Sequence, residues 1–253
     1  MLRALDRKKT RAETGLFLAE GARLIDQALA QGWQVDTLVI STSSLERDYV
    51  QALSARAAAT GARIVHVPDR LAGQIARKDN PQSLIAAIRQ KSLGLDHLDP
   101  AQAGLWIGLY QVRDPGNLGT ILRTADCADV AGVIMIDQCC DPFSVEAVRA
   151  SMGSLFDVRL ARARFDEFNS WRKQVGLSMV AASVNGDTPH TGVDFKRPSL
   201  ILMGNEQSGL PVPIEAQCDT LCLIPMRGGA DSLNLAQATA IMLYEGWRQR
   251  DFA

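Results

Sequence analysis

The sequence has few of the residues that bind metal ions. Its three histidines, His66, His97 and His190, form no HxxxH or HxE pattern. Its five cysteines form no CxxC pair, so the spacing of a structural zinc site is missing. We therefore expect no metal, and we interpret the cysteines as buried, reduced thiols of a cytosolic protein. They are Cys127, Cys139, Cys140, Cys218 and Cys222.

Long apolar runs are missing as well. No stretch approaches the roughly 18–20 consecutive apolar residues that a membrane-spanning helix needs. The first ten residues are rich in Arg and Lys but lack the apolar segment of a signal peptide. Asp6 and Glu13 also distinguish this region from the acid-poor presequences of organelle proteins. We expect a cytoplasmic protein without membrane association.

The sequence has no large excess of positive charge, with 27 Lys and Arg residues against 28 Asp and Glu residues. This balance argues against a protein held on nucleic acid by its overall charge, but it allows local patches. One basic run lies near the start, and it is either a solvated tail or a set of phosphate contacts. The run comprises Arg3, Arg7, Lys8, Lys9 and Arg11.

The glycine-rich strings of the common nucleotide-binding folds are also missing. There is no GxxxxGK[ST] string, and no GxGxxG string follows the first strand of the second half. Arg113-Asp114-Pro115-Gly116 stands at that place instead. A small-molecule enzyme of the Rossmann type is therefore a poor match.

What the sequence does contain is an alternation of helix and strand patterns. It begins within the first 98 residues, lapses between residues 91 and 104 in a Gly-, Asp- and Pro-containing stretch typical of a linker, and then starts again. Apolar strands separated by helices predict a parallel sheet with helices on both faces. We therefore predict an α/β protein with a small domain at residues 1–98 and a larger one at residues 99–253.

The periodicity also predicts individual elements. In the first domain we expect helices at 20–30 and 45–60 and strands at 35–40, 63–67 and 83–88. In the second we expect strands at 105–110, 133–136, 177–182, 200–203 and 221–224, and helices at 117–128, 145–156, 165–175 and 232–248. Ligands of parallel sheets bind beyond the carboxyl ends of the strands, so the loops there are the candidate site.

The first of these loops runs from Gln111 to Ala125. Asp114-Pro115-Gly116 predicts a sharp turn, and Asn117 and Arg123 follow it on a helix. The N-terminus of a helix suits an anion such as a phosphate. A capped helix with a surface arginine explains the same residues, and this loop alone leaves both interpretations open.

Two more loops carry glycines and polar residues. In the loop from residue 203 to 211, Gly204 lets a ligand approach the backbone, and Glu206 supplies a carboxylate. In the loop from residue 224 to 234, Asp231 or Ser232 can cap the last helix. We expect Asn234 in the first turn of that helix, buried and in need of a hydrogen-bond partner.

In this order, the three loops resemble the SpoU/TrmH family of SPOUT RNA methyltransferases. The matching strings are N-x-G-x-x-x-R from Asn117, G-x-E-x-x-G from Gly204 and I-P-M-x-G-x-x-x-S-L-N from Ile224. Residues 149–154 also look like the family, and the resemblance covers residues 104–250. Residues 1–98 are similar to the L30e-like N-terminal domain of many members, through Gly15 to Gly21 with Arg23-Leu24-Ile25.

The resemblance implies an α/β knot, with a deep trefoil knot near the C-terminus of the second domain. It implies S-adenosylmethionine as methyl donor, a ribose 2′-OH of RNA as acceptor, no metal, and a homodimer formed through the second domain. The residues that match the family's catalytic positions are Asn117, Arg123, Glu206, Ser232 and Asn234. Those that match its cofactor-binding positions are Gly204, Ile224, Met226 and Leu233.

Three functions are compatible with the resemblance. Ribosomal RNA is the favoured substrate, because the L30e-like domain resembles those of rRNA-modifying members. Transfer RNA is the alternative, although tRNA-modifying members more often carry short helical or basic extensions. A catalytically inactive RNA-binding protein is less consistent with the sequence, because Asn117, Arg123, Glu206 and Asn234 are all present.

Overall fold

The computed structural model describes residues 2–76, 83–91, 93–99 and 104–252. The chain folds into two compact units, one of residues 1–91 and 141–157 and one of residues 92–140 and 158–253. The two predicted domains were each continuous, with a boundary at residue 98. The first unit instead includes a later segment of the chain, which the sequence patterns did not indicate. The predicted linker at 91–104 lies partly outside the described residues.

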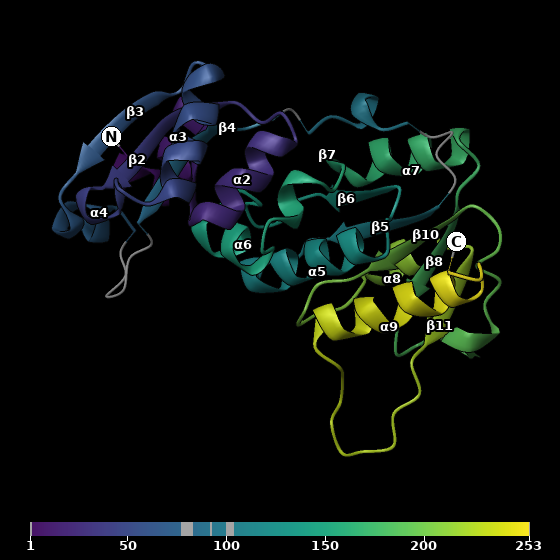
Figure 1. Ribbon diagram of the computed structural model, residues 1–253. Coiled ribbons are helices and arrows are strands. Elements are labelled where there is room, and N and C mark those ends of the chain that lie inside the picture. The colour runs from purple at the N-terminus through teal and green to yellow at the C-terminus, as the bar shows by residue number, and fades with distance from the viewer. Residues whose placement is uncertain (1, 77–82, 92, 100–103, 253) are drawn as a thin grey trace. The chain divides into compact units, whose positions relative to one another are not determined.

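The first unit is built on a mixed four-stranded sheet with the order β1-β4-β2-β3 (Figure 1). Strand β4 pairs antiparallel with β1 and β2, and β2 pairs parallel with β3. The strands are β1 (Leu16–Glu20), β2 (Val35–Ser41), β3 (Arg63–Val67) and β4 (Leu84–Arg89). The helices are α1 (Lys8–Thr14), α2 (Ala22–Ala30), α3 (Asp48–Ala59) and α4 (Asp69–Ala76).

Strand β1 was not predicted. All five of its residues are buried, so it shows no alternation of polar and apolar side chains. The helix expected from residue 20 begins at Ala22, because Gly21 has a φ of 97°, which right-handed helices do not use.

The segment 141–157 supplies part of the core of the first unit. The ring centroids of Phe143 and Phe17 lie 4.9 Å apart, and those of Phe156 and Trp33 lie 5.3 Å apart. The indole N–H of Trp33 donates a 3.0 Å hydrogen bond to the carbonyl of Phe156. Arg149 donates 2.7 Å hydrogen bonds to both carboxylate oxygens of Glu20.

The predicted helix at 145–156 is wrong beyond residue 150. Helix α6 (Val145–Ala150) ends there, and a 3-10 turn (Ser154–Phe156) follows. Between them Met152 and Gly153 have φ values of 53° and 111°, which a right-handed helix cannot contain.

Arg11 fits neither interpretation of the basic run. It is only 3% exposed, and its guanidinium forms a 2.7 Å ion pair with Asp141 and a 2.9 Å hydrogen bond to the carbonyl of Leu5. Arg11 therefore stabilises the first unit, whereas the other residues of the run are exposed. Those residues are Arg3, Arg7, Lys8 and Lys9.

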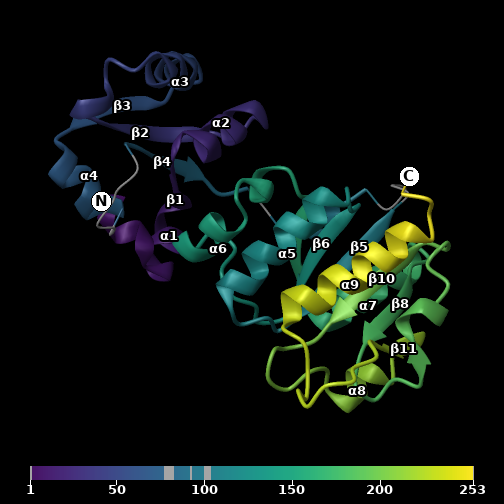
Figure 2. The same cartoon turned by 60° about the horizontal axis from the view of Figure 1, so that its bottom comes forward.

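The second unit contains a seven-stranded sheet with the order β7-β6-β5-β10-β8-β11-β9. Figure 2 shows its middle strands β6, β5, β10, β8 and β11. All of its neighbouring strands pair in parallel, which confirms the predicted sheet. The strands are β5 (Leu105–Tyr110), β6 (Gly132–Ile136), β7 (Leu160–Ala163), β8 (Ser178–Ala182), β9 (Thr188–Pro189), β10 (Ser199–Met203) and β11 (Thr220–Leu223).

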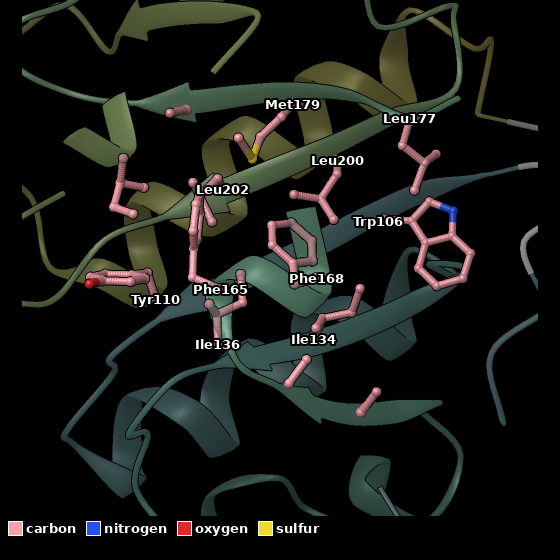
Figure 3. Packing of buried hydrophobic residues seen from close by; sticks show 14 of the residues in the cluster. Trp106, Tyr110, Ile134, Ile136, Phe165, Phe168, Leu177, Met179, Leu200 and Leu202 are labelled. Carbon is pink, nitrogen blue, oxygen red and sulfur yellow. The ribbon is translucent and has the colours of Figure 1, made fainter. Parts of the chain in front are cut away.

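Helices cover both faces of this sheet. On one face lie α5 (Pro115–Cys127) and α9 (Leu235–Arg248), side by side in both views (Figures 1 and 2). On the other lie α7 (Phe165–Gln174) and α8 (Val212–Glu215). Figure 3 shows the core beneath them, where Phe168 of α7 packs among Trp106, Leu200 and other strand residues.

Helix α9 lies very close to the sheet. A Cβ atom at Gly246 would come within 2.7 Å of the Leu105 side chain, so only glycine fits at that position without movement of the neighbours. This close packing fixes the helix that follows the third candidate loop. The predicted knot remains a prediction.

Two further expectations concern the whole chain. In the part of the chain that the structure describes, no helix is long and apolar enough to cross a membrane. The five cysteines are free, but only Cys222 is buried, and Cys127 is exposed, so the expectation of buried thiols is wrong for Cys127.

Candidate active site

The three candidate loops meet at one edge of the sheet of the second unit. They follow β5, β10 and β11, and the loop of residues 183–187 follows β8. These four strands are neighbours in the order β5-β10-β8-β11, and their parallel alignment places all four carboxyl ends together. The site is therefore assembled by the topology from segments that are far apart in the sequence.

A pocket of about 540 Å³ opens between the loops that follow β8, β10 and β11. This volume lies in the range of roughly 300–1,000 Å³ that is usual for small-molecule sites. All four residues that were predicted to bind the cofactor line the pocket, as do Glu206 and Ser232. The four are Gly204, Ile224, Met226 and Leu233.

Gly204 allows the second loop to fold back on itself. A Cβ atom here would lie 2.5 Å from the carbonyl carbon of Gly209 and 2.7 Å from the amide nitrogen of Leu210. Any larger residue would push these backbone segments apart, so glycine is required at this position. The closed loop holds Asn205 and Glu206 between its two ends.

Glu206 ties the second loop to the first. Its carboxylate accepts hydrogen bonds from the backbone N–H groups of Arg113 (3.1 Å) and Asp114 (3.0 Å) and from the side-chain amide of Asn117 (3.3 Å). Burial acts to raise the pKa of Glu206, but hydrogen bonds from these donors and from its own backbone N–H outweigh it and lower the pKa below its ordinary value.

Asn117 and Asn234 extend the network to the third loop. The Asn234 amide donates a 3.0 Å hydrogen bond to Oδ1 of Asn117, while its own Oδ1 accepts from the backbone N–H of Ala236 at 2.9 Å. Asn234 is therefore the N-cap of α9, is exposed, and is not in the first helical turn. The predicted capping by Asp231 or Ser232 is wrong, and the last helix begins at Leu235.

Arg123 lies elsewhere on α5. It follows Asn117 by six positions, so with about 3.6 residues per turn the two side chains leave the helix in different directions. Its side chain is exposed. Among the described residues, the pocket lining includes Glu206 and Ser232 but not Asn117, Arg123 or Asn234. Two of the five predicted catalytic residues thus line the pocket, and the other three do not.

Asn205 is a site residue that the sequence patterns did not single out. Its amide donates a 2.8 Å hydrogen bond to the carbonyl of Gln111, and its Oδ1 accepts from the backbone N–H of Gln207 at 2.9 Å. Gln111 has a φ of 51°, which is costly for a residue with a Cβ. Asn205 therefore stabilises the turn that leads from β5 into the first loop.

A hydrogen-bonded polar group in the pocket lining was also missed. It contains Ser183 and Asn185, after β8, and Glu215, at the end of α8. The signal that could have found the first two was present, because they follow a predicted strand of the same parallel sheet. Glu215 lies in a short helix that has no sequence pattern of its own.

Metal binding and nucleophilic catalysis by a cysteine are two chemical possibilities that can be assessed directly. Within the described residues, no group of three or more His, Cys, Asp or Glu side chains could hold a metal ion. Burial, followed by the nearby Cys139, Glu206 and Asp114, raises the pKa of the Cys140 thiol to about 12. Cys140 is therefore protonated at neutral pH and is not a nucleophile there.

Two family models match different parts of the chain. Residues 104–244 match the SpoU rRNA Methylase family. Residues 1–86 match the MRM3-like substrate binding domain. The first match covers the whole site described above, and it covers more than half of the chain.

Named relatives and solved structures extend these matches. The chain is 32% identical to the 23S rRNA (uridine(2479)-2′-O)-methyltransferase of Streptomyces viridochromogenes, over 96% of this chain and 85% of that protein. It is 36% identical to the tRNA (cytidine(34)-2′-O)-methyltransferase of Beijerinckia indica, over 56% of this chain and 90% of that protein. The crystal structure of the AdoMet-bound rRNA methyltransferase from Sinorhizobium meliloti superposes with a TM-score of 0.91 at 42% identity, covering 98% of this chain and 92% of that chain.

Proposed function

The chain belongs to the SpoU rRNA methylase family, and we propose that it transfers a methyl group from S-adenosylmethionine to a ribose 2′-OH of ribosomal RNA. The observation that carries this proposal is the site itself. The pocket with its four predicted cofactor residues lies beside the hydrogen-bonded chain from Glu206 through Asn117 to Asn234. A small-molecule site is thereby joined to an exposed polar surface on which RNA can lie.

The pocket fits S-adenosylmethionine in size and chemistry. Ile224, Met226 and Leu233 provide apolar surface for an adenine ring, and Gly204 brings backbone groups to the pocket wall. When bound, S-adenosylmethionine supplies an electrophilic methyl group. We propose that these four residues hold the cofactor.

We propose that Arg123 acts on the RNA. A ribose hydroxyl is a poor nucleophile at neutral pH, so the site must favour loss of its proton. A guanidinium carries only donors and remains charged, so it is unsuited to act as a base. Arg123 instead binds a phosphate and stabilises the negative charge that develops on the ribose oxygen.

The other polar residues place the reacting groups. Three donors already occupy the Glu206 carboxylate, so we assign it to holding the first loop in shape. Asn117 links that loop to Asn234, which we propose orients the 2′-OH from the start of α9. Ser232 lines the pocket and supplies a hydroxyl where cofactor and ribose would meet.

Ribosomal RNA is favoured over transfer RNA as the substrate, because an rRNA methyltransferase matches a larger share of this chain than a tRNA methyltransferase does. The rRNA methyltransferase of S. viridochromogenes matches 96% of this chain, whereas the tRNA methyltransferase of B. indica matches 56%. The first unit, which resembles a substrate-binding domain, therefore has its counterpart in the rRNA enzyme. Because ribosomal RNA in bacteria is cytoplasmic, we propose the cytoplasm as the location.

Mapping of ribose methylation tests this function. The 2′-O-methyl positions of rRNA and tRNA are compared between cells with and without the gene. Loss of one methylation in rRNA supports the proposal, and loss of one in tRNA supports the alternative substrate. If no ribose methylation is lost, and the purified protein transfers no methyl group to either RNA, the proposed activity is wrong and the alternative of an inactive RNA-binding protein is favoured.

We also propose that the protein is a homodimer through the second unit. Helix α9 presents Ile241 and Tyr244, which are 36% and 43% exposed. The ring centroids of Tyr244 and Trp247 lie 5.5 Å apart. An apolar helical face of this kind is suited to burial against another surface. Light scattering coupled to size exclusion tests the proposal, which predicts twice the mass of one chain and a shift towards the monomer in Tyr244→Asp.

A further inference from the structure

Among the described residues, the side chains that line the pocket include the acids Glu206, Glu215 and Asp231 but no Lys or Arg. S-adenosylmethionine has a net positive charge, because its sulfonium and ammonium groups outweigh its carboxylate. The thioether left after methyl transfer has lost the sulfonium charge. A pocket lined in this way therefore attracts the cofactor more strongly than the product.

Glu215 is the most enclosed of the three acids. It is 8% exposed, and its carboxylate accepts hydrogen bonds from the Ser183 hydroxyl at 2.5 Å and from the Asn185 amide at 3.2 Å. Both donors are uncharged. In the described part of the chain no Lys or Arg nitrogen lies within ion-pair distance of it.

A buried carboxylate without a cationic partner is unfavourable unless a ligand offsets the cost. Glu215 lines the pocket, so a positively charged ligand in the pocket would offset part of the cost of burying its carboxylate. The low effective dielectric of an enclosed site strengthens this interaction compared with a carboxylate in solvent.

The other two acids are less able to act in this way. The Glu206 oxygens are occupied by two backbone N–H groups and by Asn117. Asp231 is exposed in the loop before α9, where water and salt screen its charge. Any charge preference of the pocket therefore depends most on Glu215.

We propose that Glu215 makes the pocket selective for the positively charged cofactor over the thioether product, S-adenosylhomocysteine, whose net charge is zero. Ser183 and Asn185 are positioning residues that hold its carboxylate at the pocket wall. The preference favours exchange of product for fresh cofactor after each turnover. This inference rests on the proposed function, because it assumes that the pocket binds S-adenosylmethionine.

Titration calorimetry tests the inference with both ligands and three proteins: wild type, Glu215→Gln and Asp231→Asn. In Glu215→Gln, which keeps the size of the side chain, we expect S-adenosylmethionine to bind about threefold to tenfold more weakly. Binding of S-adenosylhomocysteine should change by less than about twofold, since the attraction to the sulfonium is absent there. Asp231→Asn removes the same charge from an exposed position of the pocket lining and should leave the affinity ratio nearly unchanged.

Two further variants make the result independent of folding defects. Glu215→Asp keeps the charge and should keep the preference even if both affinities fall. Asn185→Lys places a cation beside Glu215 and should reduce the preference, so it replaces Glu215→Gln if circular dichroism shows that Glu215→Gln does not fold. Equal weakening for both ligands, or an unchanged ratio, overturns the inference. If the wild type binds neither ligand, the proposed function itself fails.

Discussion

The side chain of Glu206, in the second loop, holds the first loop in place through several hydrogen bonds. Its two carboxylate oxygens accept from the backbone N–H groups of Arg113 and Asp114 and from the Asn117 amide. Glu206→Gln would direct an NH₂ group at some of these donors and leave them unpaired. An unpaired polar group costs roughly 1–3 kcal/mol, so we expect methyl transfer to slow by about tenfold to hundredfold.

Single-turnover methyl transfer at saturating S-adenosylmethionine measures this loss. Gln207→Ala alters the exposed neighbour in the same loop and serves as the matched control, with an expected rate close to the wild type. A Glu206→Gln rate equal to that of the control would show that the carboxylate does not hold the loop.

Arg123 has a different role, because it lies on the exposed side of α5 and outside the pocket lining. Arg123→Ala should abolish methyl transfer and leave S-adenosylmethionine binding near normal, since only contacts with the RNA are removed. Arg123→Lys keeps a charge but loses the planar fork of donors, so we expect a partial rate. The measurements are methyl transfer to RNA and cofactor titration, and surviving activity in Arg123→Ala would contradict the assignment.

At the scale of elements, Asn234 at the start of α9 contributes both to the stability of the helix and to the hydrogen bonds of the site. Asn234 caps the helix through its Oδ1 and donates from its Nδ2 to Asn117. Asn234→Ala removes both interactions, and loss of the cap alone should lower the free energy of unfolding by about 1 kcal/mol. Asn234→Asp keeps the cap acceptor but places an oxygen opposite Oδ1 of Asn117.

The two variants therefore separate stability from activity. Urea unfolding should show Asn234→Asp close to the wild type and Asn234→Ala destabilised, while both lose methyl transfer. If Asn234→Asp retains the wild-type rate, the hydrogen bond to Asn117 is not needed for the reaction.

The C-terminal part of α9 carries a carboxylate that responds to pH. Hydrogen bonds from Arg248, despite the opposing effect of burial, lower the pKa of Glu245 from 4.5 to about 2. The stabilisation from a lowered carboxyl pKa is present above the unfolded value and is lost as pH falls through the folded value. Unfolding experiments should show stability falling between pH 4.5 and about 2, with a shallower fall in Glu245→Gln than in the wild type.

The elements of the second unit could largely be predicted, because a buried parallel strand leaves an apolar run and helices a periodic one. The errors occur where the backbone departs from these patterns. The left-handed φ values of Met152 and Gly153, which end α6, have no signal in the periodicity. Strand β1 lacks alternation because both of its faces are buried.

The four predicted cofactor residues of the pocket, Gly204, Ile224, Met226 and Leu233, belong to strings that lie within single loops. The contacts between loops could not be predicted, because they depend on the order of strands in the sheet. The hydrogen bond between Asn234 and Asn117 joins residues 117 positions apart. Without that order, Asn234 looks like a polar residue inside the last helix, not its cap.

At the scale of the whole molecule, the first unit depends on a segment that comes later in the chain. Phe143 and Phe156 are 3% and 4% exposed, and Phe17 and Trp33 cover them. Burying an aromatic side chain of this size contributes roughly 1.5–3 kcal/mol. Residues 1–91 therefore complete their core with residues 141–157, and neither part is a complete folding unit alone.

A truncation that removes residues 1–91 should consequently fail to give a well-behaved protein. The segment 141–157 would lose Phe17 and Trp33 and expose both of its phenylalanines, so we expect binding of a hydrophobic dye and aggregation. In the matched control, residues 141–157 are also replaced by a Gly/Ser linker of equal length, and dye binding should fall. A truncated protein that stays monomeric without binding dye would show that the segment does not depend on the first unit. Because truncation disturbs this packing, RNA binding by the first unit is better tested with point variants of its exposed basic residues, such as Arg7 and Lys8.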